Sequence, residues 1–95
     1  MTPSIGHIVH YRLTGSDADT INSRRHPLTT NPGDINCHIG NRVREGDAFP
    51  AVIVRVFDSS SDIVNLQVWL DGADSHWATS RPQGEGPGTW ESPLD

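Results

Sequence analysis

The stretch from Val64 to Gly72 alternates apolar and polar residues without a break and ends in an Asp-Gly turn. Successive side chains on a strand point to opposite faces, so strict alternation predicts a half-buried strand. The face expected to contact the core consists of Val64, Leu66, Val68 and Leu70. The opposite face carries Asn65, Gln67 and Trp69, and we expect these two amides and the indole to point away from the core.

Segments before this run are also typical of strands. In residues 7–13, Val9, Tyr11 and Leu13 share one face, and Ile8, His10 and Arg12 share the other. The run from Ala51 to Phe57 is rich in β-branched residues and is apolar on both faces, which favours a central strand. Its expected faces are Val52, Val54 and Val56 on one side, and Ile53, Arg55 and Phe57 on the other.

The remaining elements are a helix, a loop and short strands. Ser16 stands three residues before Asp19, which is close to a capping-box pattern, so a helix is expected over residues 17–25. Ala18 and Ile21 should point toward the core, and Pro27 should end the helix. Residues 27–36 are turn-rich and predict a variable surface loop. We expect a short bent strand within 37–43, then strands at 63–70, 76–81 and 89–91.

Together these elements predict a mainly β fold. Short strands joined by turns, with one short helix after the first strand, are typical of a small SH3-like or OB-like β-barrel of five to six strands. Because the chain has only 95 residues, we expect a single domain over residues 1–95.

Composition narrows the class of partner. The lone Cys37 cannot form an internal disulfide, and a core this small makes self-association, and hence a homo-oligomer, an expected way to bury more surface. The net charge of -5 argues against binding polymeric DNA or RNA, although a small anion needs only one or two cations. All seven basic residues are Arg, which excludes lysine-dependent phosphate loops and Schiff bases. No apolar run suits a membrane span or a signal peptide, so we expect a soluble intracellular protein with no membrane partner.

Neither a metal site nor a catalytic group is expected. His7 and His10 point to opposite faces of a strand, and the adjacent Cys37 and His38 diverge. His76 and Ser80 lie on one strand about 13 Å apart, beyond hydrogen-bond reach. We therefore expect no metal, no cofactor and no catalytic residue, and an enzyme acting on nucleotides is the third hypothesis.

The large aromatic residues carry the functional hypothesis. Core packing is the usual fate of Trp in a small barrel, but Trp69 lies opposite the aliphatic face of its strand. An exposed indole beside two amides suits a planar, polar ligand, because bases stack on such rings and amides pair with base edges. Arg81 precedes the glycine-rich loop 84–88, which is either a wide turn, the favoured interpretation, or a phosphate cradle.

The predicted ligand site therefore combines rings, cations and hydrogen-bonding groups. Trp69, Trp77 or Tyr11 would stack on bases, and Arg81 and Arg12 would meet phosphate. Asn65, Gln67, Thr79 and Ser80 would hydrogen-bond a base or ribose. The expected partner is a small nucleotide held at a subunit interface, close to Trp69 and Arg81.

Five short sequence segments carry a resemblance to one group of proteins. They are GHIVHYRL at 6–13, PAVIVRVF at 50–57, VNLQVWLDG at 64–72, WATS at 77–80 and GEGPGTW at 84–90. With these segments the chain resembles a family of small proteins encoded by tailed phages, mostly those of actinobacteria. The resemblance implies a phage protein acting in the host cytoplasm, and it carries no activity that can be assigned residue by residue.

Two functional hypotheses follow from this context. The first is an anti-defence sponge for immune evasion, which sequesters a cyclic nucleotide immune signal without catalysis. The alternative is a protein-interaction module, either a virion component or an inhibitor of a host protein, that uses Trp69 as a hot spot. An acidic mimic of DNA is a less favoured idea, because the negative charge is modest and scattered over turns.

Overall fold

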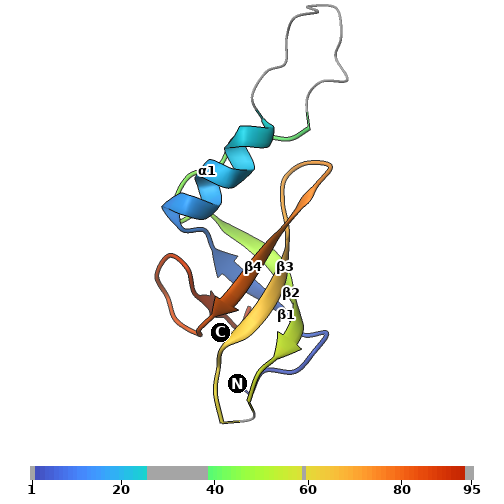
Figure 1. Cartoon of the computed structure of the whole chain (residues 1–95), viewed down its shortest axis with the longest axis vertical. Coiled ribbons are helices and arrows are strands. Elements are labelled where there is room, and N and C mark those ends of the chain that lie inside the picture. The colour runs from blue at the N-terminus through green and yellow to red at the C-terminus, as the bar shows by residue number, and fades with distance from the viewer. Residues whose placement is uncertain (1, 26–38, 59, 94–95) are drawn as a thin grey trace, which may run out of the picture.

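The computed structural model describes residues 2–25, 39–58 and 60–93, which fold into five strands and one helix (Figure 1). The elements in chain order are β1 (Ile8–Arg12), α1 (Gly15–Arg24), β2 (Ala48–Val56), β3 (Val64–Trp69), β4 (Ser75–Arg81) and β5 (Trp90–Glu91). All neighbouring strands are antiparallel, and their order in the sheet is β4-β3-β2-β1-β5. The most β-branched strand is therefore central, as its two apolar faces indicated.

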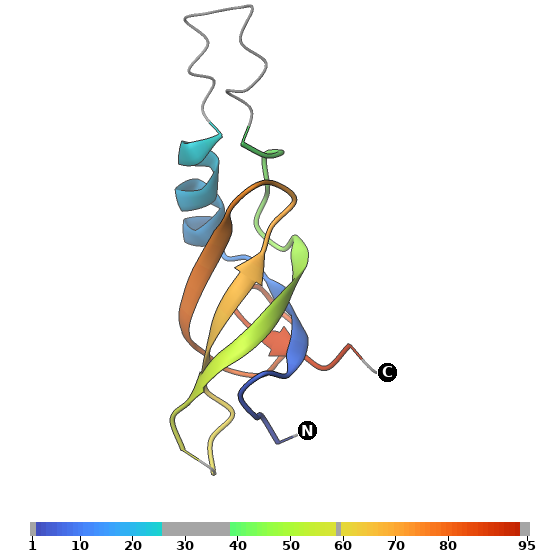
Figure 2. The ribbon, with the colours of Figure 1, turned by 90° about the vertical axis from the view of Figure 1, so that its right-hand side faces the viewer.

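The sheet twists strongly around its own core (Figure 2). Just after β4, Gln83 forms a parallel bridge with Trp90 of β5, which draws the two ends of the sheet toward each other. The mainly β, barrel-like architecture with one helix after the first strand is confirmed. Gly40 forms only an isolated bridge with Gly72, so the described part of the expected strand at 37–43 is not a strand. The loop predicted at 27–36 lies outside the described residues.

The core is built from the inner sides of all five strands and one side of α1. Ala18 and Ile21 of the helix are buried, as expected, and full burial of an aliphatic side chain such as Ile21 contributes about 1.5–3 kcal/mol. The buried apolar residues are Val9, Tyr11, Leu13, Ala18, Ile21, Val43, Ala51, Ile53, Val64, Leu66, Val68, Leu70, Ala78 and Trp90. The aliphatic face predicted for β3 is thus the core face.

The helix begins two residues earlier than the pattern indicated. Thr14 is the N-cap: its hydroxyl accepts from the backbone N–H of Asp17 at 2.9 Å, and the Asp17 carboxylate accepts from the backbone N–H of Thr14 at 3.0 Å. The capping box is therefore formed by Thr14 and Asp17, and the predicted box of Ser16 and Asp19 is wrong. In Thr-x-x-Asp, as in the Ser-x-x-Asp pattern, the two side chains accept from backbone N–H groups at the helix start that have no partner within the helix.

A β-bulge in β2 overturns part of the predicted face assignment. Ile53 pairs with Leu66, but the next two pairs are Arg55 with Asn65 and Val56 with Val64. The extra residue reverses the inside-outside alternation beyond it. Val56 therefore packs against the core, whereas Val54 stays exposed, so the two do not share a face.

A second bulge lies directly opposite, in β4. Leu66 pairs with Ala78 and Val64 with Arg81, so both Thr79 and Ser80 oppose the single residue Asn65. Ser80 has a φ of 59°, in the left-handed region that a non-glycine residue seldom adopts. The extra residue moves the Arg81 side chain from the outer to the inner side of the sheet.

Within the described residues, no helix has both the length and the apolar character needed to cross a membrane.

Candidate functional site

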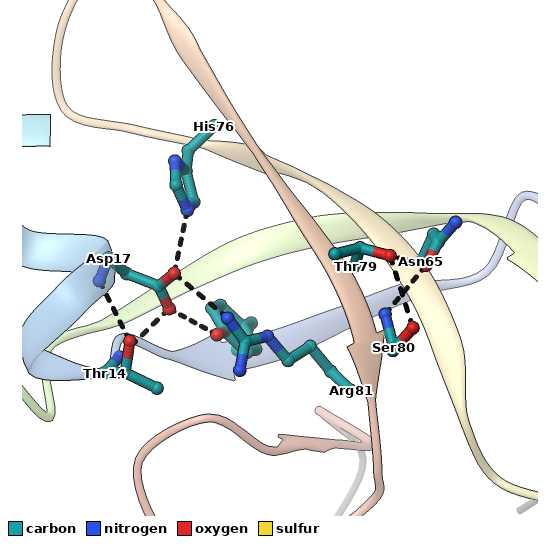
Figure 3. Close-up of polar contacts among 8 residues, drawn as sticks. Thr14, Asp17, Asn65, His76, Thr79, Ser80 and Arg81 are labelled. Carbon is teal, nitrogen blue, oxygen red and sulfur yellow. Dashed lines mark hydrogen bonds and ion pairs between the residues drawn. The ribbon is translucent and has the colours of Figure 1, made fainter. Parts of the chain in front are cut away.

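A buried carboxylate, Asp17, joins the start of α1 to both β1 and β4 (Figure 3). Its Oδ1 accepts from His76 Nε2 at 3.0 Å and from an Arg81 guanidinium N–H at 3.2 Å. Its Oδ2 accepts from the Tyr11 hydroxyl and from the Thr14 backbone N–H. We call these five residues the Asp17 cluster, and it ties together segments up to 64 residues apart in the chain.

The protonation states of this cluster follow from its geometry. Burial alone would raise the pKa of Asp17, but hydrogen bonds from His76, Tyr11 and Thr14 and the charge of Arg81 outweigh it and hold that pKa well below its ordinary value. Burial, followed by the hydrogen bond to Asp17 and its negative charge, raises the pKa of Tyr11 well above its ordinary value. Asp17 is therefore ionised and Tyr11 protonated near neutral pH, which suits a structural role for both groups.

Three residues predicted to contact a ligand are engaged inside the fold. The Tyr11 ring is fully buried, so it offers no surface on which a base could stack. Arg81 bonds Asp17, and its guanidinium carbon lies 5.8 Å from the centre of the Tyr11 ring. Arg12 donates to a Glu91 carboxylate oxygen at 2.6 Å. These ion pairs neutralise the two cations that were expected to meet phosphate, although within the described residues Arg12 Nη1 and Arg81 Nε are buried without a hydrogen-bond partner.

Asn65 is also used internally, although it points to the outer side of β3. Its side-chain oxygen accepts from the Thr79 hydroxyl at 2.9 Å and from the Ser80 backbone N–H at 2.8 Å (Figure 3). Only 7% of Asn65 is exposed. The amide thus holds the β4 bulge, and the exposed Thr79 and Ser80 lie beside it rather than across a pocket.

Trp69 and Trp77 are exposed on the outer side of the sheet, as the β3 alternation predicted for Trp69. Trp69 is 46% exposed and Trp77 is 56% exposed. The half-buried Gln67 is the cross-strand partner of Trp77. The orientation on which the binding hypothesis depends is therefore confirmed.

These three residues belong to a wider surface that crosses four strands. One row of cross-strand partners runs Ile8, Val52, Gln67, Trp77. A second row is formed by His10 with its partner Pro50 and by Trp69 with its partner Ser75. Because Ala51 pairs with Val68, the preceding Pro50 lies level with Trp69. We call these eight residues the outer face, and none of them carries an acidic side chain, an Arg or a Lys. The ion pair of Arg12 with Glu91 borders this face, because Glu91 is the partner of His10 on β5.

Arg81 lies far from the exposed indoles. Trp69 pairs with Ser75 at one end of β3, whereas Arg81 pairs with Val64 at the other end. Five residue steps along the strand separate these positions, which corresponds to about 16 Å. The expected pocket between Trp69 and Arg81 is therefore not formed by one copy of the chain.

The glycine-rich loop behaves as a turn. The N–H of Gly84 donates to the Trp90 carbonyl at 2.9 Å, and the N–H of Gly88 donates to the Arg12 carbonyl at 2.7 Å. Gly88 has a φ of 82° and packs against Thr14, so a side chain there would be both strained and crowded. These donors close the loop onto β1 and β5, in agreement with the turn interpretation.

A further ion pair, which the sequence did not reveal, lies at the C-terminal end of α1. The Arg25 side chain is 1% exposed and donates twice to Asp74, at 2.6 and 2.7 Å, and once to the Asn41 carbonyl at 3.1 Å. Gly40 and Gly72 lie against this guanidinium, because a Cβ on either would approach it to 2.6–2.7 Å. The hydrogen bond from Arg25 lowers the pKa of Asp74. We call Arg25, Asp74 and Asn41 the Arg25 clamp.

The adjacent Arg24 and Arg25 at the helix end were the available signal for this clamp. In the sequence they suit only the favourable placement of cations at a helix C-terminus, since Asp74 lies 49 residues further along the chain.

In the described part of the chain, no three His, Cys, Asp or Glu side chains are grouped to hold a metal ion. Cys37 and His38 lie outside that part. The sequence matches no protein-family model, and no curated protein or solved structure gives a significant match.

Proposed function

We propose that this chain is a non-catalytic binding protein that captures another protein on its outer face. The observation that carries the proposal is the absence of acidic residues, Arg and Lys from eight surface residues across four strands, in a chain with 20% charged residues. The same surface holds both exposed indoles. This combination is the composition of an interface centre, where charge is depleted and Trp is enriched.

The energetic argument rests on the two indoles. Solvent-exposed Trp side chains on a small protein leave apolar area in water, and contiguous apolar patches of this kind mark interaction sites. Trp is among the residues that dominate binding energy, with losses of about 2 kcal/mol or more on truncation at a hot spot. Gln67 lies beside Trp77 and supplies hydrogen-bond donors and acceptors at the centre of the face.

The charge of the chain suggests the chemistry of the partner. An uncharged centre on a protein of net charge -5 suits a partner surface with an apolar middle and a basic rim. Such complementarity steers the encounter and sets specificity. In the phage context that the resemblance of these sequence segments implies, we propose a host protein as this partner and an inhibitory role for the complex.

The test is an affinity capture from host lysate with matched variants. The bait is the full chain, compared with Trp69→Ala, Trp77→Ala and their double variant. Phe57→Ala is the control, because Phe57 is an aromatic residue of similar exposure, 48%, outside the outer face. We expect one host protein to be captured by the wild type and by the control, and to be lost with the double variant.

Titration of that purified host protein by calorimetry then measures the loss. Each indole removed should weaken binding by about thirtyfold, the equivalent of 2 kcal/mol. Capture that survives in the double Trp variant would refute the outer face as the binding surface. Detection of the chain in many copies in purified virions would replace the host partner with a virion partner.

Capture of a cyclic nucleotide is the second candidate function. It is favoured by the direct pairing of Trp77 with Gln67, because an indole beside a carboxamide suits a stacked and hydrogen-bonded base. Calorimetry with a panel of cyclic di- and trinucleotides tests it. Heat of binding that disappears in Trp77→Ala would establish it, and flat titrations across the panel would remove it.

A further inference from the structure

We infer that a second copy of this chain binds along β4, with the two β4 strands antiparallel, so that the sheet continues from one copy into the other. The inference concerns the edge of the sheet rather than its outer face. It is therefore independent of the partner proposed above.

The first observation is the position of β4. It is the terminal strand of the sheet, and within the described residues it has a strand neighbour, β3, on one side only. Alternate backbone N–H and C=O groups of such a strand point away from the sheet and offer a template for another strand. The Ser75 carbonyl accepts from Arg24 at 3.2 Å, which marks the N-terminal limit of the available edge.

The second observation is that the usual edge protection is confined to the C-terminal end of β4. Natural edge strands discourage pairing with Lys, other charges, Pro or a bulge. From Ser75 to Ser80, β4 carries no acidic residue, no Arg or Lys, and no Pro. The bulge at Thr79 and Ser80 bends only its C-terminal end. Between the Ser75 carbonyl, which Arg24 engages, and the bulge at Thr79 and Ser80, the edge of β4 is consequently open to pairing.

The third observation concerns charge. Two copies of net charge -5 repel each other unless they meet where charge is absent or neutralised. Asp74, next to the start of β4, is neutralised by Arg25 at 2.6 Å and by Arg24 at 2.8 Å. Arg81, at the other end, is paired with Asp17. The β4 edge thus lets two acidic molecules approach without opposing unpaired charges.

Antiparallel pairing of one strand with its own copy is self-complementary about a twofold axis. An axis near the middle of Ser75–Thr79 brings the Trp77 side chains of the two copies together, and the outer faces become one continuous surface. An interface of one strand per copy lies at the small end of specific interfaces, below about 1,200 Å² in total. We therefore expect a dimer that dissociates on dilution.

The test compares two tryptophans of similar exposure. Trp77→Lys places like charges across the proposed seam, whereas Trp69→Lys places the same charge on β3, away from the edge. Sedimentation equilibrium over a wide concentration range measures the dimer dissociation constant of each protein. Circular dichroism verifies that both variants fold, which we expect because both positions are exposed.

We expect the wild type and Trp69→Lys to dimerise alike, and Trp77→Lys to dimerise at least about tenfold more weakly, since like charges in facing strands repel. A wild type that stays monomeric throughout, or an unimpaired Trp77→Lys dimer, would overturn the inference. Equal loss in both variants would indicate docking through the outer faces and would also overturn it.

Amide hydrogen exchange supplies an independent readout. Concentrating the wild type should slow exchange at the amides within Ser75–Thr79 that point away from β3, because edge pairing satisfies them. Exchange there that does not depend on protein concentration contradicts the inference. Failure of the host-partner proposal is distinguishable, since capture of a partner depends on both indoles, whereas the dimer is weakened only by the charge that Trp77→Lys introduces.

Discussion

Replacing Asp17 by Asn is the sharpest test of how this fold is held together. The substitution preserves shape but places an amide NH2 group, a donor, where the carboxylate accepts from several donors. Hydrogen bonds to a charged group contribute about 1.5–3 kcal/mol each, and breaking a buried ion pair costs about 3–5 kcal/mol. The bonds from Tyr11 and His76 are buried, whereas Arg81 is 27% exposed and its share is reduced by solvent screening. We expect a loss of about 3 kcal/mol at neutral pH.

The pH dependence of this loss has a defined sign. The folded-state pKa of Asp17 lies below its ordinary value. The stabilisation from its carboxylate is thus complete above the unfolded pKa of about 3.9 and disappears as the pH falls through the folded pKa. Because Asp17→Asn has no such carboxylate, the stability gap between the variant and the wild type should narrow below about pH 4.

Urea unfolding followed by tryptophan fluorescence and circular dichroism measures this gap at a series of pH values. Asp19→Asn is the matched control, because Asp19 is an exposed residue of the same helix. We expect its effect to stay within about 0.5 kcal/mol. A gap for Asp17→Asn below about 1 kcal/mol at neutral pH, or one that is constant into acid, would refute the role assigned to the Asp17 cluster.

Four further predictions concern the two bulges and the Arg25 clamp. Asn65→Ala should destabilise the fold by about 1–3 kcal/mol because the Ser80 N–H and the Thr79 hydroxyl lose their acceptor. Ser80→Gly should stabilise the fold by up to about 1 kcal/mol because glycine tolerates a positive φ. Chemical denaturation measures both changes, and an Asn65→Ala variant as stable as the wild type would contradict the account of the β4 bulge. Val56→Asp should destabilise the fold strongly because Val56 packs against the core, whereas Val54→Asp should leave the stability almost unchanged because Val54 is exposed. Equal melting temperatures of the two variants would mean that the β2 bulge does not separate their faces. Gly72→Ala should cost about 1–3 kcal/mol, since its Cβ would lie 2.7 Å from the clamp guanidinium, and an unchanged melting temperature would disprove this crowding.

The candidate site was only partly accessible to sequence reasoning. The outward position of Trp69 follows from alternation along a single strand, and it is confirmed. The engagement of Tyr11 and Arg81 by Asp17 does not follow from any local pattern, because the donors are 6 and 64 residues from the carboxylate. Residues that look like free ligand-binding groups in the sequence are therefore engaged by Asp17 inside the fold.

By itself, the sequence determined the class of the fold, the helix after the first strand, the aliphatic core face of β3 and the exposed indole behind it. These features depend on the local periodicity of side chains, which is written along each segment. Only the tertiary structure decided which side Val56 and Arg81 occupy, because bulges arise from the register between strands and reverse the alternation beyond them. It also decided that the Asp17 cluster is closed and the outer face open, since both depend on which distant segments meet.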